Sequence, residues 1–236
     1  METLYIVMPA YNEEENIEAV VEQWYPILNG KGENSCLVVA DSGSNDNTHD
    51  ILLELKKTKF PSMEILSDTN QCHGPKLMAL YEYAINNHAD YIFQTDSDGQ
   101  TDPSEFSGFW NERDNYEAIF GKRTVRGDGK NRAFVEYVLC FLLKIFFGVS
   151  IPDANAPFRL MKAESVKKYL YMMPREYNLP NVMLTTFFTY YKENIAFKEI
   201  SFRPRRAGVN SINIAKIIKI GWKALGDFKE FKKEMQ

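Results

Sequence analysis

Short apolar runs alternate along the chain with longer segments whose apolar positions recur at helical spacing. This alternation is typical of a sheet whose strands are joined by crossover helices, so we predict an α/β fold with a Rossmann-like, mostly parallel sheet. The predicted strands in the first half are Leu4–Met8, Cys36–Asp41, Met63–Leu66, Tyr91–Thr95 and Glu117–Gly121. The predicted helices between them cover residues 16–28, 46–57, 75–87 and 103–111, with Asp46 and Asp102 at N-cap positions.

The second half of the sequence is less regular. A basic loop follows Gly121. An apolar helix over 134–147 and an irregular connection into a strand come next. We then expect a helix over 181–192, a strand over 195–202 and a terminal helix over 212–233. No linker rich in Gly, Pro or Ser separates the halves, so we treat residues 1–236 as a single domain.

The composition narrows the class of protein. With 44% hydrophobic and 25% charged residues, the chain is neither disordered nor a coiled coil, and a net charge of -4 argues against a nucleic-acid partner. Three widely spaced cysteines predict reduced thiols. The start has no secretory leader, and the longest apolar run falls short of the ~20 residues of a spanning helix, so we expect a cytoplasmic protein.

Polar residues follow the first two predicted strands. The first strand runs into Pro9-Ala-Tyr-Asn-Glu13, and the second ends at Asp41 before a glycine turn. Ligands of open α/β sheets bind beyond the carboxyl ends of the strands, which makes these residues candidate ligand contacts. A helix start with acids near its N-terminus, or a capped turn, explains each segment equally well on its own. The glycine-rich loops of dinucleotide and P-loop proteins are absent.

The fourth predicted strand delivers Asp96, Asp98 and Gln100 into a loop. Alternate residues of an extended segment point the same way, so these three side chains can converge on one point. Two carboxylates and an amide oxygen suit Mg²⁺ or Mn²⁺, and such an ion can neutralise a nucleotide diphosphate. The alternative is that the aspartates only cap a turn.

In their order and spacing these three blocks resemble the family 2 glycosyltransferases of GT-A fold, in particular the polyprenyl-phosphate sugar transferase branch. The resemblance covers nearly the whole chain. It implies a nucleotide-sugar-binding half over 1–120, an acceptor half over 121–211 and an amphipathic helix over 212–236. It implies metal ligation by Asp96, Asp98 and Gln100, and donor contacts by Pro9, Tyr11, Asn12, Glu13, Asp41, Gly74, Lys76 and Ser97.

Three later segments also resemble that branch: Gly121–Arg126, Asp153–Arg159 and Arg206–Ser211. Residues 121–133 hold five basic residues and one acid, and guanidinium groups hold phosphate through paired hydrogen bonds. A solvated basic loop is the alternative. The resemblance implies Asp98 and Arg206 as catalytic residues, and the acceptor-phosphate residues Arg123, Arg126, Arg132, Arg159 and Ser211.

The expected reaction is an inverting transfer from a UDP- or GDP-linked sugar to a polyprenyl phosphate. A phosphate acceptor is largely ionised at pH 7 and needs no general base, whereas a glycan hydroxyl does. Residues 174–181 lack the Glu-Asp pair and Q-x-x-R-W motif of hydroxyl-using members, which favours the phosphate. Glu176 is the fallback base for a hydroxyl acceptor, and a degenerate scaffold domain is the non-enzymatic alternative.

Two helices suggest a membrane surface as a partner. The helix over 134–147 is apolar around most of its circumference, and the terminal helix interleaves Trp222 and phenylalanines with six lysines. Such helices commonly lie in the membrane interface, so we expect peripheral attachment at the cytoplasmic face. The alternative is that the two helices pack against each other or form a homodimer contact. Whether the chain also needs a membrane-spanning partner is left open by the sequence.

Overall fold

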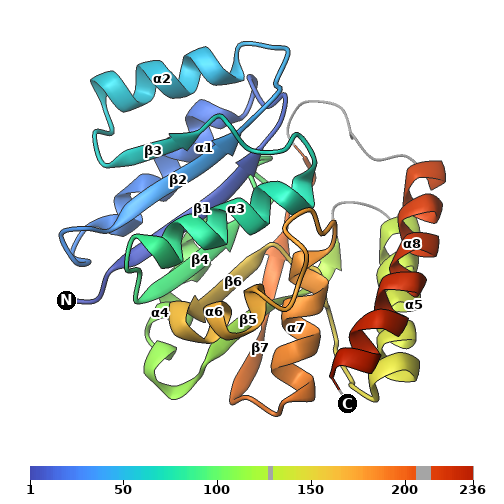
Figure 1. Ribbon diagram of the computed structural model, residues 1–236. Helices are drawn as coiled ribbons and strands as arrows, with labels where there is room; N and C mark the ends of the chain where they lie inside the picture. Colours follow the sequence, from blue (N-terminus) through green and yellow to red (C-terminus); the bar gives the residue numbers. More distant parts are fainter. Residues whose placement is uncertain (127–129, 206–213, 236) are drawn as a thin grey trace.

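The computed structural model describes residues 1–126, 130–205 and 214–235, and these contain a sheet of seven strands in the order β3-β2-β1-β4-β6-β5-β7 (Figure 1). Strands β1, β2, β3 and β4 are parallel neighbours, whereas β6 runs antiparallel to both β4 and β5. The strand bounds are β1 Leu4–Ala10, β2 Cys36–Asp41, β3 Met63–Leu66, β4 Tyr91–Thr95, β5 Ala118–Arg126, β6 Phe158–Lys162 and β7 Ile195–Phe202.

Helices cover both faces of this sheet. The α-helices are α1 Ile17–Trp24, α2 Thr48–Thr58, α3 His73–Asn86, α4 Phe106–Trp110, α5 Lys130–Phe147, α6 Ala163–Leu170, α7 Pro180–Tyr190 and α8 Ile214–Glu234. Side chains alternate along β1, so that Tyr5 and Val7 join a core with α3, α6 and α7, while Ile6 and Met8 join a core with α1 and α2. The α/β fold expected from the sequence is confirmed.

The local predictions differ from the structure mainly at helix ends. The bounds of β2, β3, β4 and β7 are as predicted, and β5 continues five residues beyond Gly121 to Arg126. The first helix stops at Trp24, because Pro26 lies in a 3-10 turn over Tyr25–Leu28. Asp102 caps the turn that follows it, since its Oδ1 accepts from Ser104 N at 3.0 Å. Helix α6 was not predicted.

Helices α5 and α8 lie side by side at one end of the molecule (Figure 1). The rings of Phe146 and Phe147 contact that of Phe228, with centroids 5.9 and 5.7 Å apart. The two apolar helices therefore pack against each other, as one of the two alternatives predicted. A row at helical spacing on α5 nevertheless stays exposed by more than half, and this "α5 stripe" is Phe134, Tyr137, Phe141 and Ile145.

Candidate active site

The loops that follow β1 and β2 are tied to each other. Asn12 adopts a left-handed backbone conformation (φ 54°), its N–H donates to Ser44 Oγ at 3.0 Å, and its Oδ1 accepts from Asn45 N at 2.8 Å. Asp41 is buried beside them, accepting from Ser44 Oγ, with His49 Nδ1 3.2 Å from its Oδ2. The structure thus brings the two predicted nucleoside segments together at the carboxyl edge of the sheet.

Lys76 reaches the same edge from α3. Its side chain is buried, its Nζ donates to Ala10 O at 2.6 Å, and it lies 5.2 Å from the ring centroid of Tyr11. Burial lowers the pKa of this ammonium. Gly74 is explained by packing instead, because a Cβ there would lie 2.4 Å from Asn178 O. Its predicted donor contact stays a prediction.

Asp96, Asp98 and Glu13 form an acid cluster at the ends of β4 and β1. Burial, and then the charge of Asp98, raises the pKa of Asp96 to about 8. Burial likewise raises the pKa of Asp98, while the positive charges of Arg205 and Arg132 act in the opposite direction. Burial also raises the pKa of Glu13, although Arg205 donates to its carboxylate. The cluster therefore holds mutually repelling carboxylates that a cation would stabilise.

Carboxylate oxygens such as those of the acid cluster are ligands that hard divalent cations prefer. Among the described residues no group of three or more His, Cys, Asp or Glu side chains makes a metal site by itself. Mg²⁺ is commonly held by one or two carboxylates together with substrate phosphates, so a pair such as Asp96 and Asp98 is compatible with this cation, and their metal ligation stays a prediction.

Ser97 and Gln100 connect the loop after β4 to its surroundings. Ser97 Oγ donates to Pro9 O at 2.8 Å, and this bond joins the loop after β4 to the end of β1. Gln100 N donates to Asp98 Oδ1 at 3.1 Å, and Gln100 Nε2 donates to Arg203 O at 2.7 Å. The segment after β7 is thereby held beside the acid cluster. Metal ligation by the amide oxygen of Gln100 stays a prediction.

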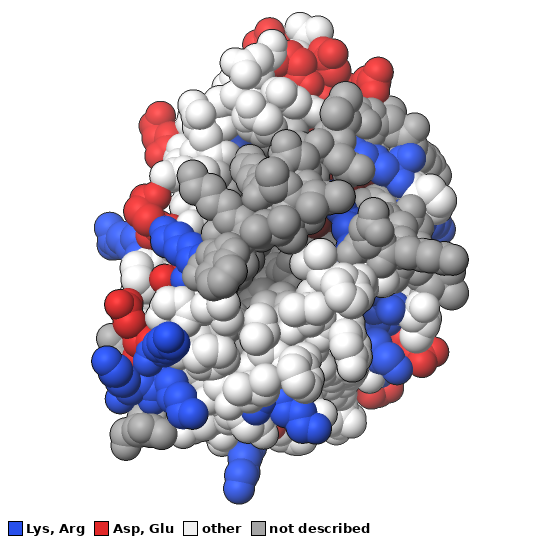
Figure 2. All heavy atoms as spheres, turned by 90° about the vertical axis from the view of Figure 1, so that its right-hand side faces the viewer, with Lys and Arg blue, Asp and Glu red and all other residues white. Residues whose placement is uncertain are grey.

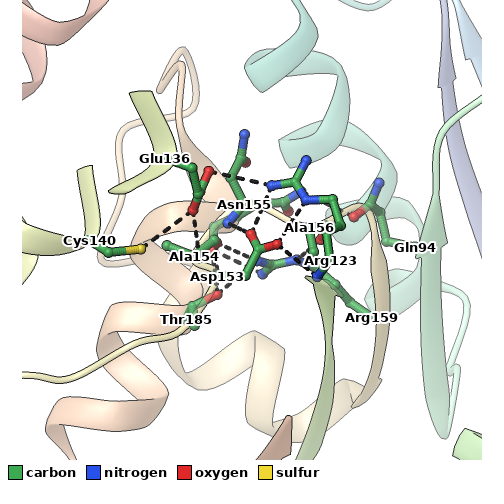
Figure 3. Close-up of polar contacts among 11 residues, drawn as sticks. Gln94, Arg123, Glu136, Cys140, Asp153, Ala154, Asn155, Ala156, Arg159 and Thr185 are labelled. Carbon is green, nitrogen blue, oxygen red and sulfur yellow. Dashed lines mark hydrogen bonds and ion pairs between the residues drawn. The ribbon is translucent and has the colours of Figure 1, made fainter. Parts of the chain in front are cut away.

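On the acceptor side, two predicted phosphate segments bind each other. The Arg123 guanidinium lies between two acids: it donates to both oxygens of Asp153 at 2.8 Å and to Glu136 Oε2 at 3.4 Å (Figure 3). Both ends of this interaction are buried. An acceptor phosphate would have to compete with Asp153 for Arg123, whereas Arg132 acts electrostatically on Asp98 and so lies toward the acid cluster.

Arg159 requires a correction. Its side chain is fully buried, and burial lowers its pKa to about 10. The prediction that it receives an acceptor phosphate is wrong, because its N–H groups are taken up inside the protein (Figure 3). The acceptors are Ala156 O at 3.0 Å, Asn181 O at 2.9 Å, Ala154 O at 2.6 Å and Thr185 Oγ1 at 2.8 Å.

Several predicted residues are not brought into the site by the described part of the chain. Arg206 and Ser211 lie outside the described residues, as does the side chain of Arg126. Glu176 is exposed and accepts a hydrogen bond from Asn70. Sequence reasoning missed Arg205, whose contact with Glu13 spans 192 positions and has no local signal.

A groove of about 700 Å³ runs beside α5. Its apolar lining includes Tyr137, Phe141 and Pro152, and its charged lining includes Arg123 and Asp153. The groove therefore offers an apolar surface next to the basic segment at the end of β5.

Comparison with known proteins identifies relatives of the chain. Residues 5–170 match the model of the family described as Glycosyl transferase family 2. The undecaprenyl-phosphate 4-deoxy-4-formamido-L-arabinose transferase of Pectobacterium atrosepticum is 23% identical over 77% of this chain and 55% of its own length. The UDP-N-acetylglucosamine--dolichyl-phosphate N-acetylglucosaminyltransferase of Methanococcus voltae is 25% identical over 70% of this chain and 71% of its own length.

Solved structures share the fold. Glucosyl-3-phosphoglycerate synthase from Mycobacterium tuberculosis, in complex with Mn²⁺, UDP-glucose and phosphoglyceric acid, superposes with a TM-score of 0.74 at 17% identity. The match covers 98% of this chain and 80% of that one. The chain spans about half the length of the first curated relatives it matches. The family and the GT-A fold expected from the sequence are confirmed.

Proposed function

Because the chain belongs to glycosyl transferase family 2, we propose that it transfers a sugar from a nucleotide-diphosphate sugar to a polyprenyl phosphate with inversion at the anomeric carbon. The observation that carries this proposal is the acid cluster of Glu13, Asp96 and Asp98 at the carboxyl edge of β1 and β4, with Arg132 and Arg205 acting on Asp98. Such an arrangement can bind a cation and a diphosphate on one side and an anionic acceptor on the other.

On the donor side, Tyr11 and the buried Asp41 flank the place where a nucleoside would bind. Asp96 and Asp98 would hold Mg²⁺ or Mn²⁺, which when bound supplies charge neutralisation of the diphosphate leaving group. The M. tuberculosis enzyme of the same fold contains Mn²⁺ and UDP-glucose in its complex, which supports a divalent cation and a nucleotide sugar here. Lys76 fixes the end of β1 through Ala10 O.

On the acceptor side, a phosphate oxygen would attack without a general base, because a phosphate monoester is largely ionised at pH 7. Arg132, and by family resemblance Arg126, Arg206 and Ser211, would hold that phosphate. Glu176 bonds to Asn70, and no interaction among the described residues joins it to the acid cluster, which favours the phosphate over a glycan hydroxyl. Relatives named as undecaprenyl-phosphate and dolichyl-phosphate transferases support the same choice.

The test is a transfer assay. Labelled UDP- and GDP-sugars are incubated with Mn²⁺ and undecaprenyl or dolichyl phosphate, and label extracted into the organic phase is measured. The proposal expects label with the lipid phosphate and none with the corresponding polyprenol, in wild type and in Glu176→Gln alike. Transfer to a polyprenol or an oligosaccharide that disappears in Glu176→Gln would contradict it.

We further propose that α5 places the protein on an anionic membrane surface. The α5 stripe is apolar and exposed, and Figure 2, which faces this side, shows an uncharged area bordered by Lys and Arg side chains, with Asp and Glu side chains among them. No helix within the described residues is long and apolar enough to cross a membrane. An amphipathic contact with basic flanks suits the cytoplasmic leaflet, where a lipid-linked acceptor would be met.

Vesicle co-sedimentation tests this contact. Phe141→Asp should reduce binding to anionic vesicles, whereas Tyr171→Asp, an aromatic residue of comparable exposure beyond α6, should bind as wild type does. Equal binding of all three proteins, or none by wild type, would refute the membrane contact.

A further inference from the structure

A buried chain of hydrogen bonds leads to Asp96 from two helices on one face of the sheet. Tyr81 Oη on α3 lies 2.7 Å from Asn181 Oδ1 on α7, and Asn181 Nδ2 lies 3.1 Å from Gln94 Oε1 on β4. Gln94 Nε2 in turn lies 3.1 Å from Asp96 Oδ1. We refer to Tyr81, Asn181 and Gln94 as the amide relay. It ends at one of the two carboxylates assigned above to the donor site.

The direction of every donor in the amide relay is fixed by its last member. A cation at Asp96 would keep its carboxylate ionised, and an ionised carboxylate only accepts hydrogen bonds, so in the cation-bound site Gln94 turns its NH₂ group toward Asp96 and its oxygen toward Asn181. Asn181 must then present NH₂ to Gln94 and its oxygen to Tyr81, whose hydroxyl supplies the last donor. All three groups therefore donate toward Asp96, and bonds aligned in this way reinforce one another.

Burial makes this arrangement rigid. Gln94 and Tyr81 are 0% exposed and Asn181 is 2% exposed, so water does not compete for their hydrogen bonds. Arg159 adds a further bond, since its guanidinium donates to Asn181 O at 2.9 Å and so fixes the first turn of α7. The relay is thus anchored in the core at its far end.

The relay leaves half of the carboxylate available. Gln94 engages only Oδ1 of Asp96, and no hydrogen bond within the described residues involves Oδ2. Gln94 is buried within β4, in register with Val7 of β1 and Arg159 of β6, so its amide depends on the hydrogen bonds that the relay supplies. Partners of this kind orient metal-binding carboxylates in other sites, and their loss typically lowers metal affinity 10- to 100-fold.

We infer that Gln94, held by Asn181 and Tyr81, is a positioning residue that fixes the Asp96 carboxylate for the divalent cation of the donor complex. The inference rests on the proposed function, because it requires a cation at Asp96. It concerns residues that touch neither sugar nor acceptor, and it predicts an effect on cation affinity rather than on the acceptor.

Cation affinity can be measured without turnover, from the electron paramagnetic resonance signal of free Mn²⁺ in the presence of UDP. Gln94→Leu keeps the bulk of the side chain and removes the donor, and it should weaken Mn²⁺ binding about 10- to 100-fold. Tyr81→Phe removes only the far hydroxyl and should weaken binding less, in the same direction. In the double variant Tyr81→Phe should have no further effect, because the relay is already broken at Gln94.

Thr186→Val is the matched control. Thr186 is buried on α7 like Asn181, but its hydroxyl donates only to Val182 O of its own helix at 2.8 Å. Its Mn²⁺ affinity should equal that of wild type, and the acceptor KM should be unchanged in all folded variants. If wild type binds Mn²⁺ with UDP and both Gln94→Leu and Tyr81→Phe bind it equally well, the relay alone is overturned. A wild type that binds no Mn²⁺ overturns the proposed cation site and the relay with it.

Discussion

The donor edge and the acceptor side both carry the charged residues that the sequence motifs single out, but the structure treats those charges differently. At the donor edge, Asp96, Asp98 and Glu13 have the same sign, and burial with mutual repulsion raises the pKa of Asp96 to about 8. On the acceptor side, Arg123 is matched by Asp153, and Arg159 by four protein oxygens.

This difference separates residues that await a ligand from residues that hold the fold. Crowded like charges lower stability, and carboxyl groups with raised pKa values cluster at functional sites, which supports the proposal that the acid cluster is the donor site. A buried guanidinium whose three nitrogens all donate to protein oxygens gains nothing from a phosphate that would displace those partners. Four predictions test this distinction.

The largest effect is expected at Asp98. Asp98→Asn should lower the rate of sugar transfer about 10³-fold, because it removes a carboxylate from the cation site. The same change relieves repulsion with Asp96, so thermal stability should stay equal or rise. Initial rates and melting temperatures measure both. A variant that loses its activity only by unfolding would contradict this account of the donor edge.

Arg159→Met should lower the free energy of unfolding by about 3–5 kcal/mol, because it leaves several buried acceptors without a donor. Arg175→Met removes an exposed arginine paired with Glu82, and its cost should stay within about 0.5 kcal/mol. Urea unfolding compares the two. If Arg159→Met were stable but raised the acceptor KM, the acceptor-phosphate role would be restored.

Arg132→Gln should raise the KM for the lipid phosphate about tenfold, equivalent to roughly 1.4 kcal/mol of lost phosphate binding, while UDP affinity changes less. The matched change Lys122→Gln affects a basic residue of the same segment that pairs with Glu199 at 3.5 Å, and it should leave the KM unchanged. Steady-state kinetics with both substrates separates them. Equal effects would indicate a general basic surface.

The smallest effect concerns pH. The pKa of Asp96 in the folded protein, about 8, lies above its ordinary value of 3.8, so the folded state binds the proton more tightly than the unfolded state does. The stability contributed by this proton is present below pH 4 and is lost as pH rises toward 8. Asp96→Asn should flatten this decline by on the order of 1 kcal/mol per pH unit. The free energy of unfolding of wild type and Asp96→Asn is measured between pH 5 and 8 without Mn²⁺. Equal slopes against pH in the two proteins would contradict a raised pKa of Asp96.

Much of the donor edge could be predicted because its signals are local. Apolar runs gave the bounds of β2, β3 and β4, and the residues just after β1, β2 and β4 meet because parallel strands share a carboxyl edge. Other contacts, on the acceptor side and behind Asp96, depend on pairings between distant segments. Arg123 and Asp153 are 30 positions apart, and Gln94 and Asn181 are 87 apart, so no periodicity indicates that these residues satisfy each other.

Helix α6 shows a second limit. It starts immediately after β6 at Ala163, with Lys162 as an N-cap that makes no side-chain capping bond. No turn residue marks the change from strand to helix, so the usual start signal is missing. Its buried face is set by contacts with α3 and α7 rather than by its own first turn.

The most direct test of the central claim is equilibrium binding of UDP and of GDP by calorimetry, each with and without Mn²⁺, to wild type and to Asp98→Asn. We predict that wild type binds one of the two nucleotides only when Mn²⁺ is present, and that Asp98→Asn loses this Mn²⁺-dependent binding while keeping its fold. Nucleotide binding that is indifferent to both Mn²⁺ and Asp98, or no binding of either nucleotide, would contradict the account of the acid cluster as the donor site.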